Sequence, residues 1–191
     1  MNEKRFLSSE EVEQELKREQ YKKRYKRTLK STVFALVTAA AAAVLVAALW
    51  LPVLEIFGSS MTPTLQEGQY VVAVKDTTPQ TGDIIAFYYG NKVLVKRCIA
   101  GPGTWVDILE DGTVTLNGQP LDEPYLEEKH FGICDLELPY QVPEGTYFLM
   151  GDHRESSVDS RHSSIGCIAT DQMVGKIVYR VWPFEDLGTV K

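Results

Sequence analysis

Ser60 is the first residue of this chain whose position suggests chemistry. It lies in Gly58-Ser59-Ser60-Met61-Thr62-Pro63-Thr64-Leu65, which begins four residues after a long uncharged apolar run. Pro63 stiffens the chain just downstream of the serine. We expect a serine in this position to stand at a membrane surface. Its hydroxyl becomes a competent nucleophile only if a neighbouring base accepts its proton.

The three histidines are poor candidates for that base. Asp152-His153 would suggest a Ser-His-Asp triad, but adjacent residues on a strand or turn do not face one another. His130 and His162 also lie in segments rich in polar and small residues. We therefore expect all three histidines to be loop residues without a catalytic role.

Lys96 is the better candidate, because it lies inside the apolar run Val93-Leu94-Val95-Lys96-Arg97-Cys98-Ile99. In an extended strand its neighbours on the same face are Leu94 and Cys98, which are both apolar. Burial among such side chains lowers the pKa of a lysine, and the resulting neutral amine is a competent general base. An exposed edge strand would instead leave the pKa at its ordinary value, and periodicity alone does not decide between the two.

A third polar stretch runs from Gly151 to Arg161 and reads Gly-Asp-His-Arg-Glu-Ser-Ser-Val-Asp-Ser-Arg. It follows a predicted strand directly. Small and charged residues in this arrangement are typical of a solvated turn. The same loop could also bring several polar groups together around a reactive side chain.

Composition divides the chain into a basic N-terminal part and an acidic remainder. The 191 residues carry a net charge of −6, and 44% are hydrophobic, which suits one domain with an appendage. Residues 1–30 hold ten Lys or Arg against six Asp or Glu, whereas residues 55–191 hold ten against twenty. The acidic body argues against nucleic-acid binding. Cys98, Cys134 and Cys167 match no zinc spacing, and we expect no metal or other cofactor.

Residues 31–54 form an uncharged run that predicts a transmembrane helix. As a helix the run spans roughly 36 Å, against a hydrocarbon core of about 30 Å. The alternative is a cleavable signal peptide, but its apolar region usually has only about 7–15 residues. We expect an uncleaved single-pass anchor in the cytoplasmic membrane. Residues 8–30 predict a charged helix with a capping box at Ser8 and Glu11. The basic segment 1–30 would stay in the cytoplasm, and residues 55–191 would lie outside.

The remainder of the chain predicts a mostly antiparallel β domain, a sandwich or barrel. Short apolar runs alternate with turn residues, and Asp111-Gly112 and Asn117-Gly118 are strong hairpin signals. The predicted strands are Tyr70–Val74, Ile84–Tyr89, Val93–Ile99, Trp105–Leu109, Thr113–Leu116, Tyr147–Met150 and Val174–Trp182. Residues 122–143 are rich in acids and prolines, which indicates a surface excursion from this domain.

Three motifs occur in one order behind the anchor. They are Ser60-Met61-Thr62-Pro63-Thr64, then Lys96-Arg97 before Gly101-Pro102-Gly103, then Gly151-Asp152 leading to Ser157 and Asp159-Ser160-Arg161. Val142-Pro143-Glu144-Gly145-Thr146-Tyr147 and Trp182-Pro183-Phe184 fit the same set. As an ordered set, the motifs resemble those of the bacterial type I signal peptidases across nearly all of residues 55–184. The single anchor and compact outer domain are most similar to the enzymes of Gram-positive bacteria.

This resemblance implies a membrane-bound serine endopeptidase that removes signal peptides from secretory preproteins at the outer face of the bilayer. Ser60 matches the family's nucleophile, Lys96 its general base, and Ser157 the serine whose hydroxyl orients the lysine amine. Four further residues match supporting positions, namely Asp159, Arg161, Arg97 and Asp152, and the last two are expected to form an ion pair. The family fold is a β-sandwich-like core, which agrees with the predicted strands.

The chain departs from the family pattern at two positions. His153 stands where the family often has asparagine, and Gly58 stands where some members carry a serine hydroxyl for the oxyanion hole. The hole would then depend on backbone N–H groups, including that of Ser60. Two alternatives remain open at this point. One is a Ser–Lys protease for a narrow set of precursors, and the other is a membrane-anchored domain that binds exported chains without cutting them.

Overall fold

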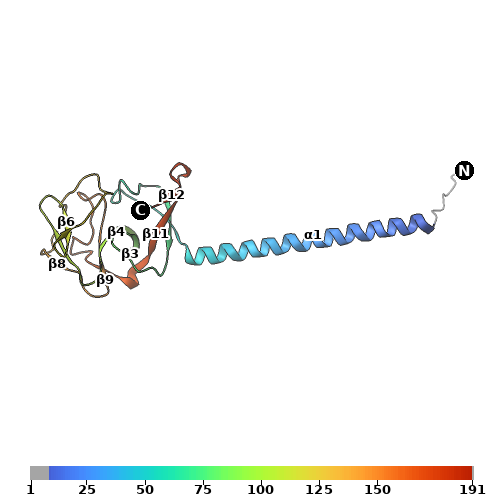
Figure 1. The fold of residues 1–191 in the computed structure, drawn as a ribbon, viewed down its shortest axis with the longest axis horizontal. Helices are drawn as coiled ribbons and strands as arrows, with labels where there is room; N and C mark the ends of the chain where they lie inside the picture. The colour runs from blue at the N-terminus through green and yellow to red at the C-terminus, as the bar shows by residue number, and fades with distance from the viewer. Residues whose placement is uncertain (1–8, 191) are drawn as a thin grey trace. The chain divides into compact units, whose positions relative to one another are not determined.

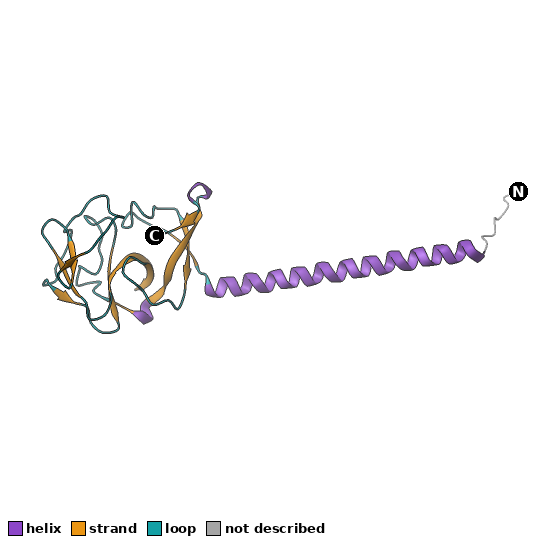
Figure 2. Ribbon diagram, in the orientation of Figure 1, coloured by secondary structure: helices purple, strands orange, loops and turns teal. Residues whose placement is uncertain are grey.

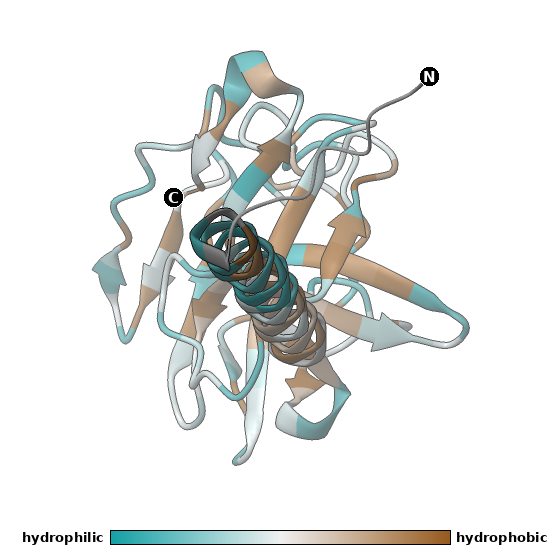
Figure 3. Cartoon of the chain, turned by 90° about the vertical axis from the view of Figure 1, so that its right-hand side faces the viewer, coloured by the Kyte–Doolittle hydropathy of each residue, from teal (hydrophilic) through white to brown (hydrophobic). Residues whose placement is uncertain are grey.

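The structure, a computed structural model, describes residues 9–190, and the chain forms two compact units with their boundary between Leu49 and Trp50 (Figure 1). The described part of the first unit lies in one continuous helix, α1 (Ser9–Trp50), whose last residue belongs to the second unit. Hydropathy changes along α1 from hydrophilic to hydrophobic, as Figure 3 shows. The helix is long and apolar enough to cross a membrane, with a mean hydropathy of 2.0 in its most apolar window. The cap expected at Ser8 lies outside the described residues.

The apolar run is helical only as far as Trp50, although the uncharged sequence continues to Leu54. Pro52 prevents the helix from continuing, because it lacks an N–H group and its ring clashes with the preceding turn. Strand β1 (Val53–Glu55) follows at once and pairs antiparallel with β2 (Tyr70–Val74). The last two residues of the predicted membrane segment are therefore part of a sheet.

The second unit confirms the prediction of a mostly antiparallel β domain behind one apolar helix (Figure 2). An eight-stranded sheet has the order β1-β2-β11-β3-β4-β9-β10, with β12 beside β11, and a four-stranded sheet has the order β7-β6-β5-β8. The further strands are β3 (Ile84–Tyr89), β4 (Lys92–Ala100), β5 (Trp105–Ile108), β6 (Val114–Leu116), β7 (Gln119–Pro120), β8 (Tyr140–Gln141), β9 (Thr146–Met150), β10 (Ile168–Ala169), β11 (Met173–Trp182) and β12 (Gly188–Thr189). Two short 3₁₀ helices, η1 (Thr170–Gln172) and η2 (Phe184–Asp186), flank β11.

All seven strands predicted from the sequence are present, with bounds shifted by at most one residue. The strands that pattern analysis missed are β1, β7, β8, β10 and β12, each of two or three residues. A segment this short contains no period of its own, and β6, which is equally short, was predicted beside the turn signals Asp111-Gly112 and Asn117-Gly118. Such pairs form because neighbouring strands offer hydrogen-bonding partners.

The loop that carries Ser60 is anchored in the core by the residues that follow the serine. Met61 and Leu65 are 2% and 0% exposed and belong to one apolar cluster with Ile56 and Val71. The Leu65 N–H donates to the Met61 carbonyl at 2.8 Å, which closes one turn of backbone between the two anchors. The position of the serine is therefore set by core packing.

Leu65→Ala is expected to lower the free energy of unfolding of the β domain by about 2–5 kcal/mol, because it leaves a cavity in a fully buried cluster. Denaturant unfolding followed by tryptophan fluorescence measures the change. Leu187→Ala is the matched control, because Leu187 is 50% exposed and its truncation should cost less than about 0.5 kcal/mol. Equal effects of the two substitutions would contradict the assignment of Leu65 to the core.

Candidate active site

A largely apolar groove of about 750 Å³ contains both Ser60 and Lys96. One wall comes from β1 and the segment that follows it, and the other comes from the first half of β4. The lining residues are Val53, Leu54, Glu55, Ile56, Phe57, Gly58, Ser60, Met61, Lys92, Val93, Leu94, Val95 and Lys96. Ser60 and Lys96 thus line one cavity that is open to solvent.

Lys96 is buried, with 4% of its surface exposed. Lys96 is paired with Ile85 of β3, and β4 pairs with β9 only from Arg97 onward, so the burial of Lys96 comes from side-chain packing. The expected neighbours Leu94 and Cys98 pack in one apolar cluster. Burial lowers the pKa of Lys96 to about 8; Asp159 and Asp152 act to raise it, and Arg161 acts to lower it. The alternative of an exposed lysine with an ordinary pKa is therefore wrong.

The Lys96 amine has a defined partner in Ser157. Lys96 Nζ lies 3.0 Å from Ser157 Oγ, and the serine is 0% exposed. The Ser157 hydroxyl also helps to lower the pKa of the nearby Asp159 carboxyl, toward which it can act only as a donor. Its oxygen is therefore directed as an acceptor toward the lysine, and this orients the amine.

Asp159 and Arg161 form a buried ion pair next to Ser157. Arg161 Nε and Nη2 each lie 2.9 Å from an oxygen of Asp159, and both side chains are fully buried. Arg161 Nη2 also donates to the Ser157 carbonyl at 3.3 Å. Burial acts to raise the pKa of Asp159, but hydrogen bonds from Arg161 and Gly151 and the charge of Arg161 hold it below the ordinary value. Asp159 therefore stays ionised and can accept from Ser157.

Arg97 and Asp152 form a second buried ion pair. Arg97 Nε and Nη2 donate to the two carboxylate oxygens at 2.8 and 2.7 Å. Thr64, four residues after Ser60, donates its hydroxyl to Asp152 at 2.5 Å and accepts from Arg97 at 3.2 Å. This pair connects the segment that carries Ser60, the strand of the lysine and the polar loop in one network.

Gly151 is the backbone position around which Ser60 and Ser157 meet. A β-carbon at Gly151 would lie 2.1 Å from Ser157 Oγ and 2.5 Å from the Ser60 carbonyl oxygen, so only glycine fits. The Gly151 N–H donates to Asp159, and the His153 N–H donates to the Ser60 carbonyl at 3.1 Å. The polar loop therefore holds the backbone of Ser60 directly.

The imidazole rings of the three histidines contact groups other than Ser60. The His153 ring contacts the Ser156 hydroxyl, and the His162 ring contacts Ser164. His130 is exposed and lies 3.9 Å from Glu128. His153, which stands at the asparagine position of the family, interacts with Ser60 through its backbone N–H, which donates to the Ser60 carbonyl. At the second departure, Gly58 has φ of +79°, a conformation that disfavours a serine there.

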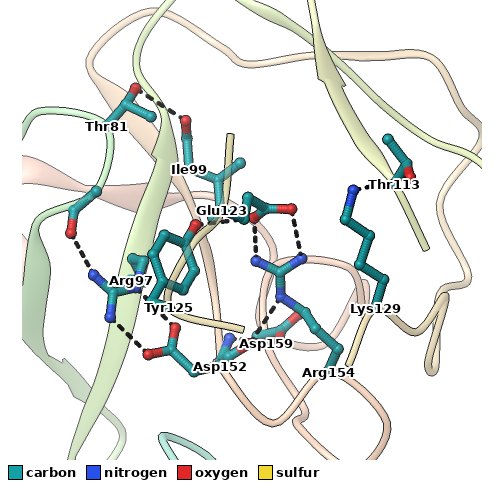
Figure 4. A network of polar contacts seen from close by, with 12 residues as sticks. Thr81, Arg97, Ile99, Thr113, Glu123, Tyr125, Lys129, Asp152, Arg154 and Asp159 are labelled. Carbon is teal, nitrogen blue, oxygen red and sulfur yellow. Dashed lines mark hydrogen bonds and ion pairs between the residues drawn. The ribbon is translucent and has the colours of Figure 1, made fainter. Parts of the chain in front are cut away.

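The sequence interpretation assigned no role to four residues of the network, namely Thr64, Glu123, Tyr125 and Arg154. Thr64 is part of the Ser60 motif, but its contacts are with residues far along the chain. Glu123 and Tyr125 lie in the segment interpreted as a surface excursion, yet Glu123 is 7% exposed and pairs with Arg154 (Figure 4). A run of acids rarely predicts a buried carboxylate, because burial requires a partner that the local sequence does not show.

All three cysteines are free thiols.

Comparison with known proteins now defines the class. The family model described as signal peptidase, peptidase S26, matches residues 29–182. The chain belongs to this family of peptidases. It is similar to signal peptidase IB of Staphylococcus aureus (strain COL), with 38% identity over 69% of this chain and 78% of that one. It is also similar to signal peptidase I of Bacillus amyloliquefaciens, with 36% identity over 70% and 75% of the two chains.

A crystal structure of a signal peptidase I from Enterococcus faecalis V583 also matches this chain. It covers 52% of this chain and 97% of the other, with 31% sequence identity and a TM-score of 0.45.

Proposed function

We propose that this protein is a membrane-bound endopeptidase that removes signal peptides from secretory preproteins, with Ser60 as nucleophile and Lys96 as general base. Its membership of the signal peptidase family supports signal-peptide removal by a serine peptidase. One observation carries the assignment of the base. Lys96 is buried, its pKa is lowered to about 8, its amine lies 3.0 Å from Ser157 Oγ, and it lines the same groove as Ser60.

In the acylation step, the neutral Lys96 amine accepts the proton of Ser60 as the hydroxyl oxygen attacks the scissile carbonyl carbon. The oxyanion that forms is stabilised by backbone N–H groups, including that of Ser60. The Lys96 ammonium then donates its proton to the leaving nitrogen, and the C–N bond breaks. The mature protein leaves with a free amine, and the signal peptide remains as an ester on Ser60.

In the deacylation step, Lys96 accepts a proton from water, and the water oxygen attacks the ester carbon. The C–O bond to Ser60 breaks, and Lys96 returns the proton to the Ser60 oxygen. Ser157 orients the amine in both steps, because its oxygen accepts a hydrogen bond from Lys96 Nζ at 3.0 Å. Arg161, Arg97 and Asp152 fix the loop and the strand that carry these groups.

The groove suits an extended peptide. Strand β1 is an edge of the eight-stranded sheet, and its residues form one wall of the groove. An extended segment before the scissile bond can pair with such an edge through backbone hydrogen bonds and place its side chains against the apolar wall. Ser60 follows β1 by five residues and lines the same groove, which supports its proposed role as the nucleophile.

The helix supports a single-pass anchor in the cytoplasmic membrane. Lys22, Lys23, Arg24, Lys26, Arg27 and Lys30 cluster directly before its apolar part. Positive residues of this kind stay in the cytoplasm, which would leave the β domain on the outer face with the bilayer and the secretory preprotein as its partners.

A cleavage assay tests this function. The purified full-length protein is incubated with a panel of preproteins, and the new N-termini are identified by mass spectrometry. We expect a single cut after the signal peptide in several unrelated preproteins. Cutting of one precursor class alone would indicate the narrower protease, and binding without a new N-terminus would indicate a non-catalytic domain.

Ser157→Ala is expected to lower kcat by about a hundredfold, because the Lys96 amine loses the partner that orients it. The KM should change little, since Ser157 does not line the groove. Steady-state cleavage of one preprotein measures both constants. Ser156→Ala provides the control, because Ser156 is the adjacent exposed serine and should retain nearly full activity.

A further inference from the structure

The segment 122–131, which we call the strap, contacts the arginines that surround the candidate site. Its sequence is Asp-Glu-Pro-Tyr-Leu-Glu-Glu-Lys-His-Phe, and it contains no helix or strand. Glu123 is 7% exposed in a stretch whose other acids are exposed. Figure 4 shows Glu123 beside Arg154 and Tyr125 against Arg97. Neither Glu123 nor Tyr125 belongs to the motifs that led to the Ser–Lys assignment.

Glu123 holds Arg154 through both of its oxygens. Arg154 Nη1 donates to Glu123 Oε2 at 3.3 Å, Nη2 donates to Oε1, and both side chains are 0% exposed. Arg154 Nε donates to the Gly151 carbonyl at 3.1 Å. Because a buried ion pair is costly to desolvate, it contributes little net stability, but its two-pronged geometry fixes the orientation of the guanidinium. The strap thereby fixes the carbonyl of Gly151.

The Gly151 backbone is the element that separates Ser60 from Ser157. Its N–H donates to Asp159 at 2.9 Å, and its α-carbon leaves no space for a side chain between the Ser157 hydroxyl and the Ser60 carbonyl. A displacement of this peptide therefore moves both serines. Arg154 binds both Glu123 of the strap and the Gly151 carbonyl. The strap is therefore connected to the Gly151 peptide, and through it to the two serines.

Tyr125 connects the strap to the other support. Its ring centroid lies 3.8 Å from Arg97 Cζ, a close cation–π contact, and its hydroxyl donates to Glu123 Oε1 at 2.9 Å. Arg97 in turn holds Asp152 through two hydrogen bonds. The Glu123 carboxylate thus fixes Arg154 directly and Arg97 indirectly, through the Tyr125 ring.

The strap also reaches the third arginine. Arg161 Nη1 donates to the Phe131 carbonyl at 2.8 Å, while the rest of its guanidinium binds Asp159 and the Ser157 carbonyl. All three buried arginines that support the loop and the lysine strand therefore have a partner in one irregular segment. None of the described residues that line the groove belongs to this segment.

We propose that Glu123 and Tyr125 are positioning residues, and that the strap sets the geometry of Ser60, Lys96 and Ser157 by fixing the three arginines from outside the groove. This inference rests on the proposed Ser–Lys function. The competing possibility is that the strap only stabilises the fold, in which case its loss would change the amount of folded protein but not the properties of the site.

Glu123→Gln separates the two possibilities, because it keeps the size of the side chain and removes its charge. We expect kcat to fall by between about tenfold and a hundredfold with KM nearly unchanged, since the groove is untouched. We also expect the acid limb of the pH profile to move to higher pH. A loosened loop admits water to Lys96, which raises the pKa of the lysine and moves the limb to higher pH. Loss of the negative charge alone would lower that pKa and move the limb to lower pH.

Tyr125→Phe is the milder variant, because it retains the ring over Arg97 and removes only the hydrogen bond to Glu123. Compared with Glu123→Gln, it should lower kcat by a smaller factor and move the acid limb to higher pH by a smaller amount. If Glu123→Gln does not fold, Tyr125→Phe alone tests the proposal. Glu137→Gln is the matched control, because this exposed glutamate lies in the same excursion. It should leave kcat, KM and the pH profile unchanged.

The measurements use the full-length protein in lipid or detergent, with rates expressed per folded molecule after the thermal transition of each variant is recorded. A lower transition temperature with unchanged kcat and an unchanged acid limb would overturn the positioning role. Ser60→Ala is measured in parallel. If that variant still cleaves, the proposed Ser–Lys function fails, whatever the strap variants do.

Discussion

Ser60→Ala and Lys96→Met are each expected to lower the rate of preprotein cleavage by between about ten thousandfold and a millionfold. The alanine removes the only atom that forms the ester. Methionine preserves the unbranched shape that the buried site holds, where Lys96 is 4% exposed, and removes the base. Single-turnover cleavage with excess enzyme measures such a loss without the limit set by product release.

Each of these variants has a matched control in the same domain. Ser59→Ala changes the adjacent exposed serine, and Lys75→Met changes an exposed lysine directly after β2. Both controls should cleave at close to the original rate. Activity of Lys96→Met within tenfold of the unsubstituted enzyme would disprove the Ser–Lys mechanism.

The double variant provides a further test of the mechanism. When two residues act as one catalytic unit, removal of either one abolishes the contribution of both. The variant that combines Ser60→Ala with Lys96→Met should therefore cleave no more slowly than either single variant. If the two losses multiplied, the serine and the lysine would be acting independently. The groove that contains both side chains favours the first outcome.

The sequence predicted the elements with a strong local pattern. The seven predicted strands follow from apolar runs and turn residues, and the apolar helix follows from a run without charge. The end of the helix was placed four residues too late, because hydropathy does not respond to the backbone effect of Pro52. The burial of Lys96 was left open, since periodicity places a residue on a face but does not say which strand covers it.

The supports of the site were predicted only where the family motif included them. Asp159, Arg161, Arg97 and Asp152 follow from that resemblance. Glu123 approaches Arg154 across 31 positions, and Thr64 approaches Asp152 across 88. Such contacts join irregular segments whose approach depends on the whole fold, so no local pattern predicts them. The groove likewise exists only after β1 and β4 have been placed in the sheet.

Cleavage should decline steeply as the pH falls below 8. Burial lowers the pKa of Lys96 to about 8, and only the neutral amine can accept the proton of Ser60. Below that pKa the neutral fraction falls about tenfold per pH unit, so the rate at pH 5 should be roughly a thousandth of the plateau. A pH profile of single-turnover rates, with protein integrity checked at each pH, measures the decline.

The position of the limb separates three bases. A limb near pH 8 fits a buried lysine, one near 10.5 would indicate a lysine with its ordinary pKa, and one near 6.5 would indicate a histidine. Asp159→Asn tests the cause of the shift. The Asp159 carboxylate raises the pKa of Lys96 and Arg161 lowers it, so loss of that carboxylate should move the limb to lower pH, even though the rate falls. A limb that moved upward would show that Asp159 acts on Lys96 mainly by keeping water out of the site, and that its charge is the smaller effect.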